Sequence, residues 1–87
     1  MHYVVKLNMD GLTSLAGNSF GNSVFERFVA PYLREDKIIV EFPEYVRNVA
    51  IGFVQGFISQ LGVEEFKKHI EVRGNPVFVS KFYERLE

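Results

Sequence analysis

The apolar stretch VRNVAIGFVQGFISQLG, residues 46–62, most constrains how this chain can fold, because its seventeen residues carry one charged side chain, Arg47. A membrane span needs about 20 predominantly apolar residues. The stretch is shorter, and Gln55, Ser59 and Gln60 interrupt it, so we exclude a span. A helix that is apolar on most of its sides is normally buried. Either this domain covers the helix completely, or a partner completes its burial.

The helix within this stretch is expected to begin at residue 49 or 50 and to end at about residue 61, with Gly62 at its C-terminus. Gly52 and Gly56 form a G-x-x-x-G spacing, which in lipid is typical of helix dimerisation. Outside a membrane we interpret these small residues as positions that let the helix lie close on a sheet.

The rest of the chain alternates between segments typical of strands and segments typical of helices. Strands are predicted at residues 2–8, 37–42 and 70–74. Further helices are predicted from residue 18 or 19 to about 30, at 63–70, and from 76 onward. The order β-α-β-α-(α)-β-α indicates an α/β fold, with a largely parallel sheet packed against helices in a single domain over residues 1–87.

The ends and inner faces of two of these helices can also be predicted. Asn18 and Ser19 are both good N-caps, and Pro31 should end or kink the first helix near residue 30 because it lacks an N–H. Asn75 should cap the last helix, with Pro76 in its first position. The residues expected to face the core are Phe20, Val24, Phe25, Phe28, Val29 and Tyr32 in the first helix, and Val79, Phe82, Tyr83 and Leu86 in the last.

Composition excludes several functional classes. The 87 residues include no cysteine, which removes disulfides, thiol catalysis and cysteine-type zinc sites. Ten basic and eleven acidic residues give a net charge of -1, and the pI is near 6.1, whereas nucleic-acid binders usually carry a basic face and a high pI. The start MHYVVKLN lacks the pattern of a signal peptide. The lack of cysteine is compatible with a reducing cytosol, and we expect a protein that binds neither nucleic acid nor membrane.

The Gly/Ser-rich segment at residues 11–23 precedes the first helix. Helix N-termini attract anions, so Gly17, Asn18 and Ser19 form a candidate anion or ligand loop. The segment contains neither a P-loop nor the G-x-G-x-x-G pattern of dinucleotide-binding proteins. We interpret the segment as a connecting loop. The alternatives are a loop that binds a ligand and a loop that contacts a partner protein.

Catalytic and metal sites have little support in the sequence. The only histidines, His2 and His69, have no obvious companion ligands, so no metal site or cofactor is predicted. Glu41 alone interrupts an apolar strand, close to the strand's carboxyl end, where open α/β sheets often bind ligands. A nucleophile–base pair needs at least two such groups within reach, and none is apparent. We therefore predict that the protein is not an enzyme.

The order of these pieces resembles the STAS-like domains, relatives of the anti-sigma-factor antagonists, over about residues 11–87. In that family a Gly/Ser-containing segment opens the first helix, here SLAGNSFGNSVFERF. An apolar strand then ends in an acidic residue and an aromatic, here IIVEF with Glu41 and Phe42. The next helix starts with small residues followed by Phe, here VAIGFVQGF. The run LGVEEFKKHIEVRG is similar to the family's closing helix-to-strand run, which a terminal helix follows.

The resemblance implies a cytoplasmic, non-catalytic regulatory module that binds partner proteins, in particular ATP-binding regulators of the histidine-kinase-like type. In the better-known antagonists a serine at the start of the second long helix is phosphorylated, which changes partner affinity. This chain departs from the pattern, because residues 49–52 read VAIG and no Ser or Thr occurs between Ser23 and Ser59. We therefore expect no phosphorylation switch at that helix start.

We predict a partner-binding surface at the start of this helix, formed by Arg47, Asn48, Ala50, Gly52 and Phe53. Two alternatives stay open. One is self-association, which would make the protein a homodimer. The other is a small-ligand or nucleotide-binding domain that uses the loop at residues 11–23.

Overall fold

Residues 2–34 and 37–86 are described by the structure, a computed structural model, and their elements follow the predicted order. The strands are His2–Lys6 (β1), Ser14–Leu15 (β2), Lys37–Glu41 (β3), Asn48–Val49 (β4) and Ile70–Arg73 (β5). The helices are Asn18–Phe28 (α1), Ile51–Ile58 (α2), Val63–His69 (α3) and Pro76–Leu86 (α4), with a short 3-10 helix at Ala30–Tyr32 (η1).

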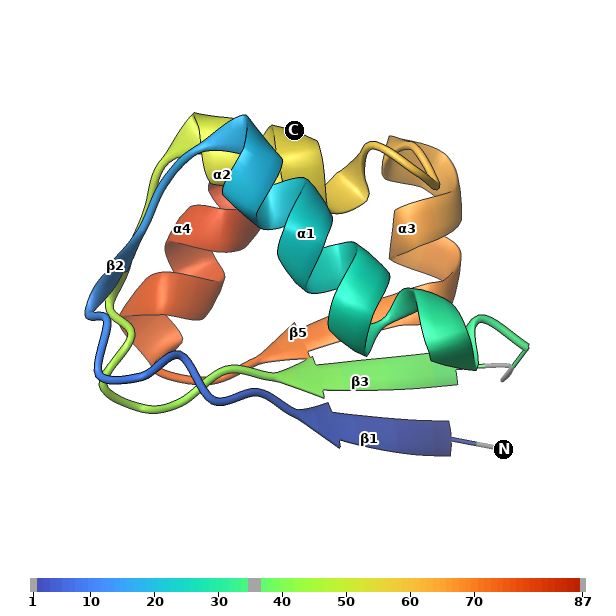
Figure 1. Cartoon of the computed structure of the whole chain (residues 1–87), viewed down its shortest axis with the longest axis horizontal. Coiled ribbons are helices and arrows are strands. Elements are labelled where there is room, and N and C mark those ends of the chain that lie inside the picture. Colours follow the sequence, from blue (N-terminus) through green and yellow to red (C-terminus); the bar gives the residue numbers. More distant parts are fainter. Residues whose placement is uncertain (1, 35–36, 87) are drawn as a thin grey trace.

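The main sheet is parallel, has the strand order β1-β3-β5, and carries all four labelled helices on one side (Figure 1). This confirms the predicted α/β fold. The two shortest strands, β2 and β4, form a separate parallel pair at one end of the molecule. This second pair was not predicted.

Strand register divides the main sheet into two different faces. Val5, Val40 and Val72 are aligned across the three strands and belong to the core beneath the helices. Val4 and Ile39 are aligned on the opposite face, which no labelled helix covers. Ile39 is nevertheless buried, although it is not part of the core cluster. The middle of the central strand β3 is therefore buried on both faces.

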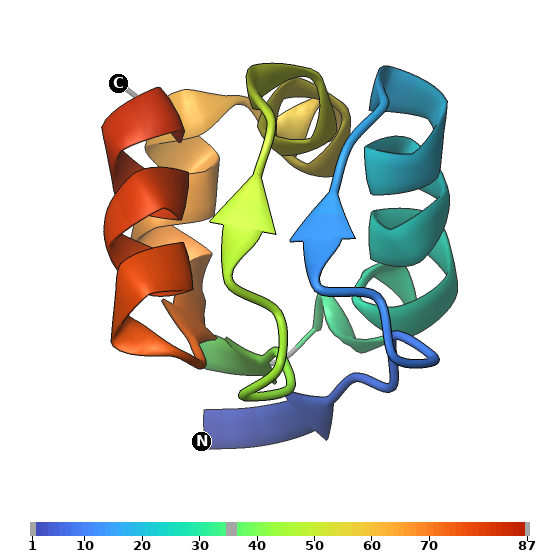
Figure 2. The ribbon, with the colours of Figure 1, turned by 90° about the vertical axis from the view of Figure 1, so that its left-hand side faces the viewer.

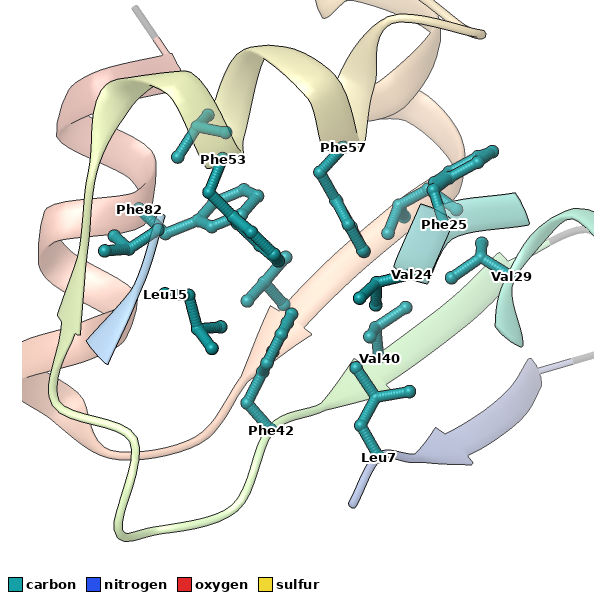
Figure 3. Packing of buried hydrophobic residues seen from close by; sticks show 14 of the residues in the cluster. Leu7, Leu15, Val24, Phe25, Val29, Val40, Phe42, Phe53, Phe57 and Phe82 are labelled. Carbon is teal, nitrogen blue, oxygen red and sulfur yellow. The ribbon is translucent and has the colours of Figure 1, made fainter. Parts of the chain in front are cut away.

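Phenylalanine dominates the core. Seven Phe side chains are fully buried, namely Phe25, Phe42, Phe53, Phe57, Phe66, Phe78 and Phe82. Phe42 directly follows β3, and its ring centroid lies 4.7 Å from that of Phe78 and 5.8 Å from that of Phe57. Figure 3 shows Phe25, Phe42, Phe53, Phe57 and Phe82 in the space between the helices and the sheet. Complete burial of one such side chain contributes roughly 1.5–3 kcal/mol, so this core stabilises a chain that has no disulfides.

Two glycines set the close contact between α1 and α2. A Cβ added at Gly56 would lie 2.0 Å from the carbonyl oxygen of Asn18, and one added at Gly21 would lie 2.2 Å from that of Phe53. The expectation that Gly56 lets its helix lie close on a sheet is therefore wrong. Gly56 faces the backbone of the neighbouring helix α1, and Gly21 of α1 in turn faces the backbone of α2.

The first helix differs from its prediction at its start and on its inner face. Its N-cap is Gly17, with φ 98°, and no side chain caps it, so the expected caps at Asn18 and Ser19 are wrong. The buried residues are Gly21, Val24 and Phe25. Because these positions face the core, Phe20 lies at the edge of the helix and is partly exposed.

The remaining helix ends depart from the predictions by a few residues. The second helix is shorter than expected, because Val49 belongs to β4 and residues 59–61 form a turn. The first helix ends at Phe28, and Pro31 lies in η1, so the chain leaves the α-helix before the proline. In contrast, the cap of α4 is confirmed, because Asn75 Oδ1 accepts a hydrogen bond from the Val77 N–H at 2.9 Å.

Candidate partner-binding surface

A two-stranded ribbon formed by β2 and β4 leads directly into α1 and α2, which therefore start next to each other (Figure 2). Ser14 is aligned with Asn48, and both are exposed, whereas Leu15 is aligned with Val49, and both are buried. The buried residues Leu15 and Val49 therefore anchor the ribbon to the core. The exposed residues Ser14 and Asn48 remain available for contacts.

Backbone hydrogen bonds fix the ribbon on both sides of the paired residues. The N–H groups of Arg47 and Asn48 donate to the carbonyl oxygen of Thr13 at 2.8 Å and 3.1 Å, and the Ala50 N–H donates to the carbonyl oxygen of Leu15 at 2.8 Å. Two segments more than thirty residues apart in the chain are therefore held in a single register.

This arrangement brings together two groups of residues that the sequence predicted separately. A Cβ at Gly52 would lie 3.7 Å from the backbone nitrogen of Asn18, so the candidate loop and the candidate partner residues are neighbours. We call this set of residues the junction surface: Ser14, Gly17, Asn18, Ser19, Arg47, Asn48, Ala50, Ile51 and Gly52. All are exposed except Gly52, which is half-buried.

Phe53 does not belong to this surface, and its prediction as a partner contact is corrected. Its side chain is fully buried. The ring stacks on Phe57 at 5.7 Å between centroids, and Phe20 and Phe42 meet it at 5.6 Å and 6.4 Å. Phe53 therefore supports the surface from beneath, because it points from α2 into the core (Figure 3).

Ile51 is the exposed apolar residue that sequence reasoning missed. It is 54% exposed, the highest value among the large apolar side chains of the described residues. A helix places residues three or four positions apart on the same side. Gln55, four residues after Ile51, is also exposed, so this polar residue in an otherwise apolar helix is the signal that marks the outer side.

Glu41 lies elsewhere. It is half-buried and lines a pocket of about 690 Å³ at the carboxyl ends of the strands, together with Lys6, Phe42, Arg73 and Gly74. Strand register places Glu41 between Lys6 and Arg73. The expected position at a strand end is confirmed. No residue of the junction surface lines this pocket, so the structure does not join Glu41 to the predicted partner residues.

The described residues contain no group of three His, Asp or Glu side chains that could hold a metal ion. His69 lies 3.2 Å from Glu65, one turn earlier on α3, and the side chain of His2 lies outside the described part. Over residues 2–34 and 37–86, no helix has both the length and the apolar character of a bilayer span.

Comparisons of the chain with protein-family models, with curated proteins and with solved structures find no match.

Proposed function

We propose that this protein is a non-catalytic regulatory module that binds another protein through the junction surface. The observation that carries the proposal is the exposed pairing of two strand-to-helix junctions over a buried Phe53. The resemblance to STAS-like anti-sigma-factor-antagonist domains supports a regulatory role in the cytoplasm. It also supports an ATP-binding regulator of the histidine-kinase-like type as the partner.

The composition of the junction surface suits a protein interface. Interfaces combine an apolar centre with polar groups and are enriched in Arg. Ile51 supplies the apolar group, Ser14 and Asn48 supply hydrogen-bonding groups, and Arg47 supplies a flexible cation. The start of α2 has no hydroxyl group, so any regulation differs from phosphorylation at that helix start.

Affinity capture tests this proposal. The tagged protein is incubated with its native lysate, and bound proteins are identified by mass spectrometry beside the variants Ile51→Glu and Arg47→Glu. The matched control is Lys68→Glu, which makes the same charge reversal on α3, where Lys68 is 67% exposed. We expect one partner to be captured by the wild type and by Lys68→Glu, and to be lost from both junction variants.

All variants must first show wild-type circular dichroism and unfolding midpoints. A partner that both folded junction variants retain would show that the contact lies on another surface. Absence of any captured protein would contradict the binding module itself.

Small-ligand binding through the loop at residues 11–23 is the second candidate. The favouring observation is that α1 begins on the exposed residues Gly17, Asn18 and Ser19 with no side-chain cap. A helix N-terminus of this kind attracts anions. Thermal unfolding with ATP, GTP and other anionic metabolites tests it, since a ligand at 100 times its Kd adds about 2.7 kcal/mol to the free energy of unfolding. Unchanged unfolding with every ligand would exclude this candidate.

A further inference from the structure

Arg47 is the only charged residue of the junction surface. Residues 11–25 contain no charged residue, and residues 45–63 contain only Arg47. Next to the ribbon, α4 adds Lys81, whose ammonium group donates a hydrogen bond to Asn48 Oδ1. A chain with a net charge of -1 thus presents two cations, and no carboxylate from these segments, on this side.

Neither cation is neutralised by a carboxylate of the described residues. Among the described residues, Arg47 and Lys81 form no ion pair. Other charged side chains do pair locally, such as Lys68 with Glu65 and Arg73 with Glu71. Arg47 and Lys81 are therefore free to form charge-assisted hydrogen bonds with carboxylates of a partner, which are roughly twice as strong as neutral ones.

The start of α2 and helix α4 carry the two most exposed large apolar side chains of the described residues. Ile51 is 54% exposed at the start of α2, and Val77 is 52% exposed on α4. Val77 lies four residues before Lys81, on the same side of that helix. Lys81 in turn is bonded to Asn48 of the ribbon, which leads into Ile51. Exposed apolar groups beside polar ones are typical of interaction sites.

From this combination, and resting on the proposed function, we infer that the partner docks through an acidic, apolar segment. Its carboxylates meet Arg47 and Lys81, and its aliphatic or aromatic side chains cover Ile51 and Val77. Such pairing speeds association and suppresses incorrect partners, and it weakens as salt rises.

The same charges argue against a second copy as the occupant. A two-fold dimer places the same patch of both subunits in contact. Arg47 and Lys81 would then face another basic surface, and like charges placed together in an interface are unfavourable. An acidic segment of a partner protein therefore fits this surface better than a second copy of the same surface does.

Selection from a displayed library of random linear peptides tests the inference. Immobilised wild-type protein is the bait, and the double variant Arg47→Glu/Lys81→Glu is the counter-selection bait. We expect enriched peptides in which Asp or Glu alternates with large apolar residues. Their Kd should rise by about tenfold or more on the double variant, rise with salt, and stay unchanged on Lys68→Glu.

A charge-swapped peptide supplies the second measurement. Replacing the acidic residues of an enriched peptide by Lys should restore binding to the folded double variant and abolish binding to the wild type. Enriched peptides without acidic residues, or peptides that bind both baits equally, would overturn the inference. A library that yields no binder would also overturn it. So would a wild-type dimer, detected by analytical ultracentrifugation, that the substitution Arg47→Glu dissociates. Lysate capture by the junction surface would remain a separate test of the binding module.

Discussion

Gly21 of α1 lies directly against the backbone of Phe53 in α2. A Cβ at Gly21 would be 2.2 Å from the Phe53 carbonyl oxygen and 2.9 Å from the backbone nitrogen of Phe57. Both neighbouring atoms belong to a helix backbone, so they cannot rotate away as the end of a side chain would. This contact holds α1 and α2 at a short, fixed separation, and with them the two junctions that form the candidate surface.

We therefore expect Gly21→Ala to destabilise the protein, because one added methyl group must push two helices apart. Overpacking a core typically lowers the free energy of unfolding by about 1–3 kcal/mol, and we expect a loss at or above the upper end of this range because the contact is so short. Gly56→Ala should behave in the same way, since its Cβ would lie 2.0 Å from the carbonyl oxygen of Asn18. Urea unfolding measures the change as a lower midpoint with an unchanged slope.

Gly52→Ala is the matched control, because its Cβ would meet nothing closer than 3.7 Å. Alanine is favoured over glycine in a helix by roughly 1 kcal/mol in the interior. This variant should therefore be as stable as the wild type or more stable. Equal losses at all three glycines would contradict the close-contact explanation.

Phe53 and Ile51, two residues apart, should respond in opposite ways to a charged substitution. Phe53→Glu would place a carboxylate in a fully buried position, and truncation of a buried Phe alone costs about 3–5 kcal/mol. Since small domains are stable by only about 5–15 kcal/mol, we expect Phe53→Glu to unfold. Ile51→Glu is a surface change and should shift stability by no more than about 0.5 kcal/mol. Circular dichroism and urea unfolding distinguish them, and a folded Phe53→Glu would disprove the buried placement.

The strand and helix order was predictable because it depends on local hydrophobic patterns. The pairing of β2 with β4 was not, since two-residue strands such as Asn48–Val49 carry too little pattern and depend on a partner more than thirty residues away. A similar limit explains why Phe53 was predicted as a partner contact although it is buried. Its helix is apolar on most sides, so periodicity alone did not separate its inner side from the outer side that carries Ile51.

Gly21 illustrates a different limit. Hydrophobic periodicity selects large apolar residues, and it assigned Phe20 to the inner side of α1. Tertiary packing instead requires a residue without a side chain where the two helices meet. The candidate loop and the candidate partner residues were both found from sequence, but their adjacency depends on this helix contact.

The hydroxyl groups of Tyr83 and Tyr45 offer a paired test of a part-buried hydrogen bond and of a more exposed pair. Tyr83 accepts a hydrogen bond from the Val72 N–H at 2.9 Å, in a part-buried position on the outer edge of β5. Tyr83→Phe leaves that donor unsatisfied, which costs about 1–3 kcal/mol. Amide hydrogen exchange at Val72 should also accelerate. Unchanged exchange at Val72 would mean that another acceptor replaces the hydroxyl.

Tyr45→Phe should cost less. Its hydroxyl accepts from the N–H groups of Met9 and Gly11 at 3.2 Å and 3.3 Å, but the Gly11 contact is exposed, so water can replace part of what is lost. We expect a loss below about 1 kcal/mol, with faster exchange confined to the loop after β1. If Tyr45→Phe lowered the free energy of unfolding more than Tyr83→Phe does, the Tyr45 hydroxyl would be the one that contributes more to stability, contrary to this prediction.

The starts of α4 and α1 differ, because a side chain caps α4 and none caps α1. Asn75 Oδ1 accepts from the Val77 N–H, and its Nδ2 group donates to the Glu44 carbonyl oxygen at 3.1 Å. Asn75→Ala should therefore lower the free energy of unfolding by about 1 kcal/mol. Ser19→Ala removes no cap, because α1 begins after Gly17 without one, and should change stability by no more than about 0.5 kcal/mol. Urea unfolding of the two variants decides the matter: a larger loss at Ser19 than at Asn75 would mean that α1 is capped by a side chain after all.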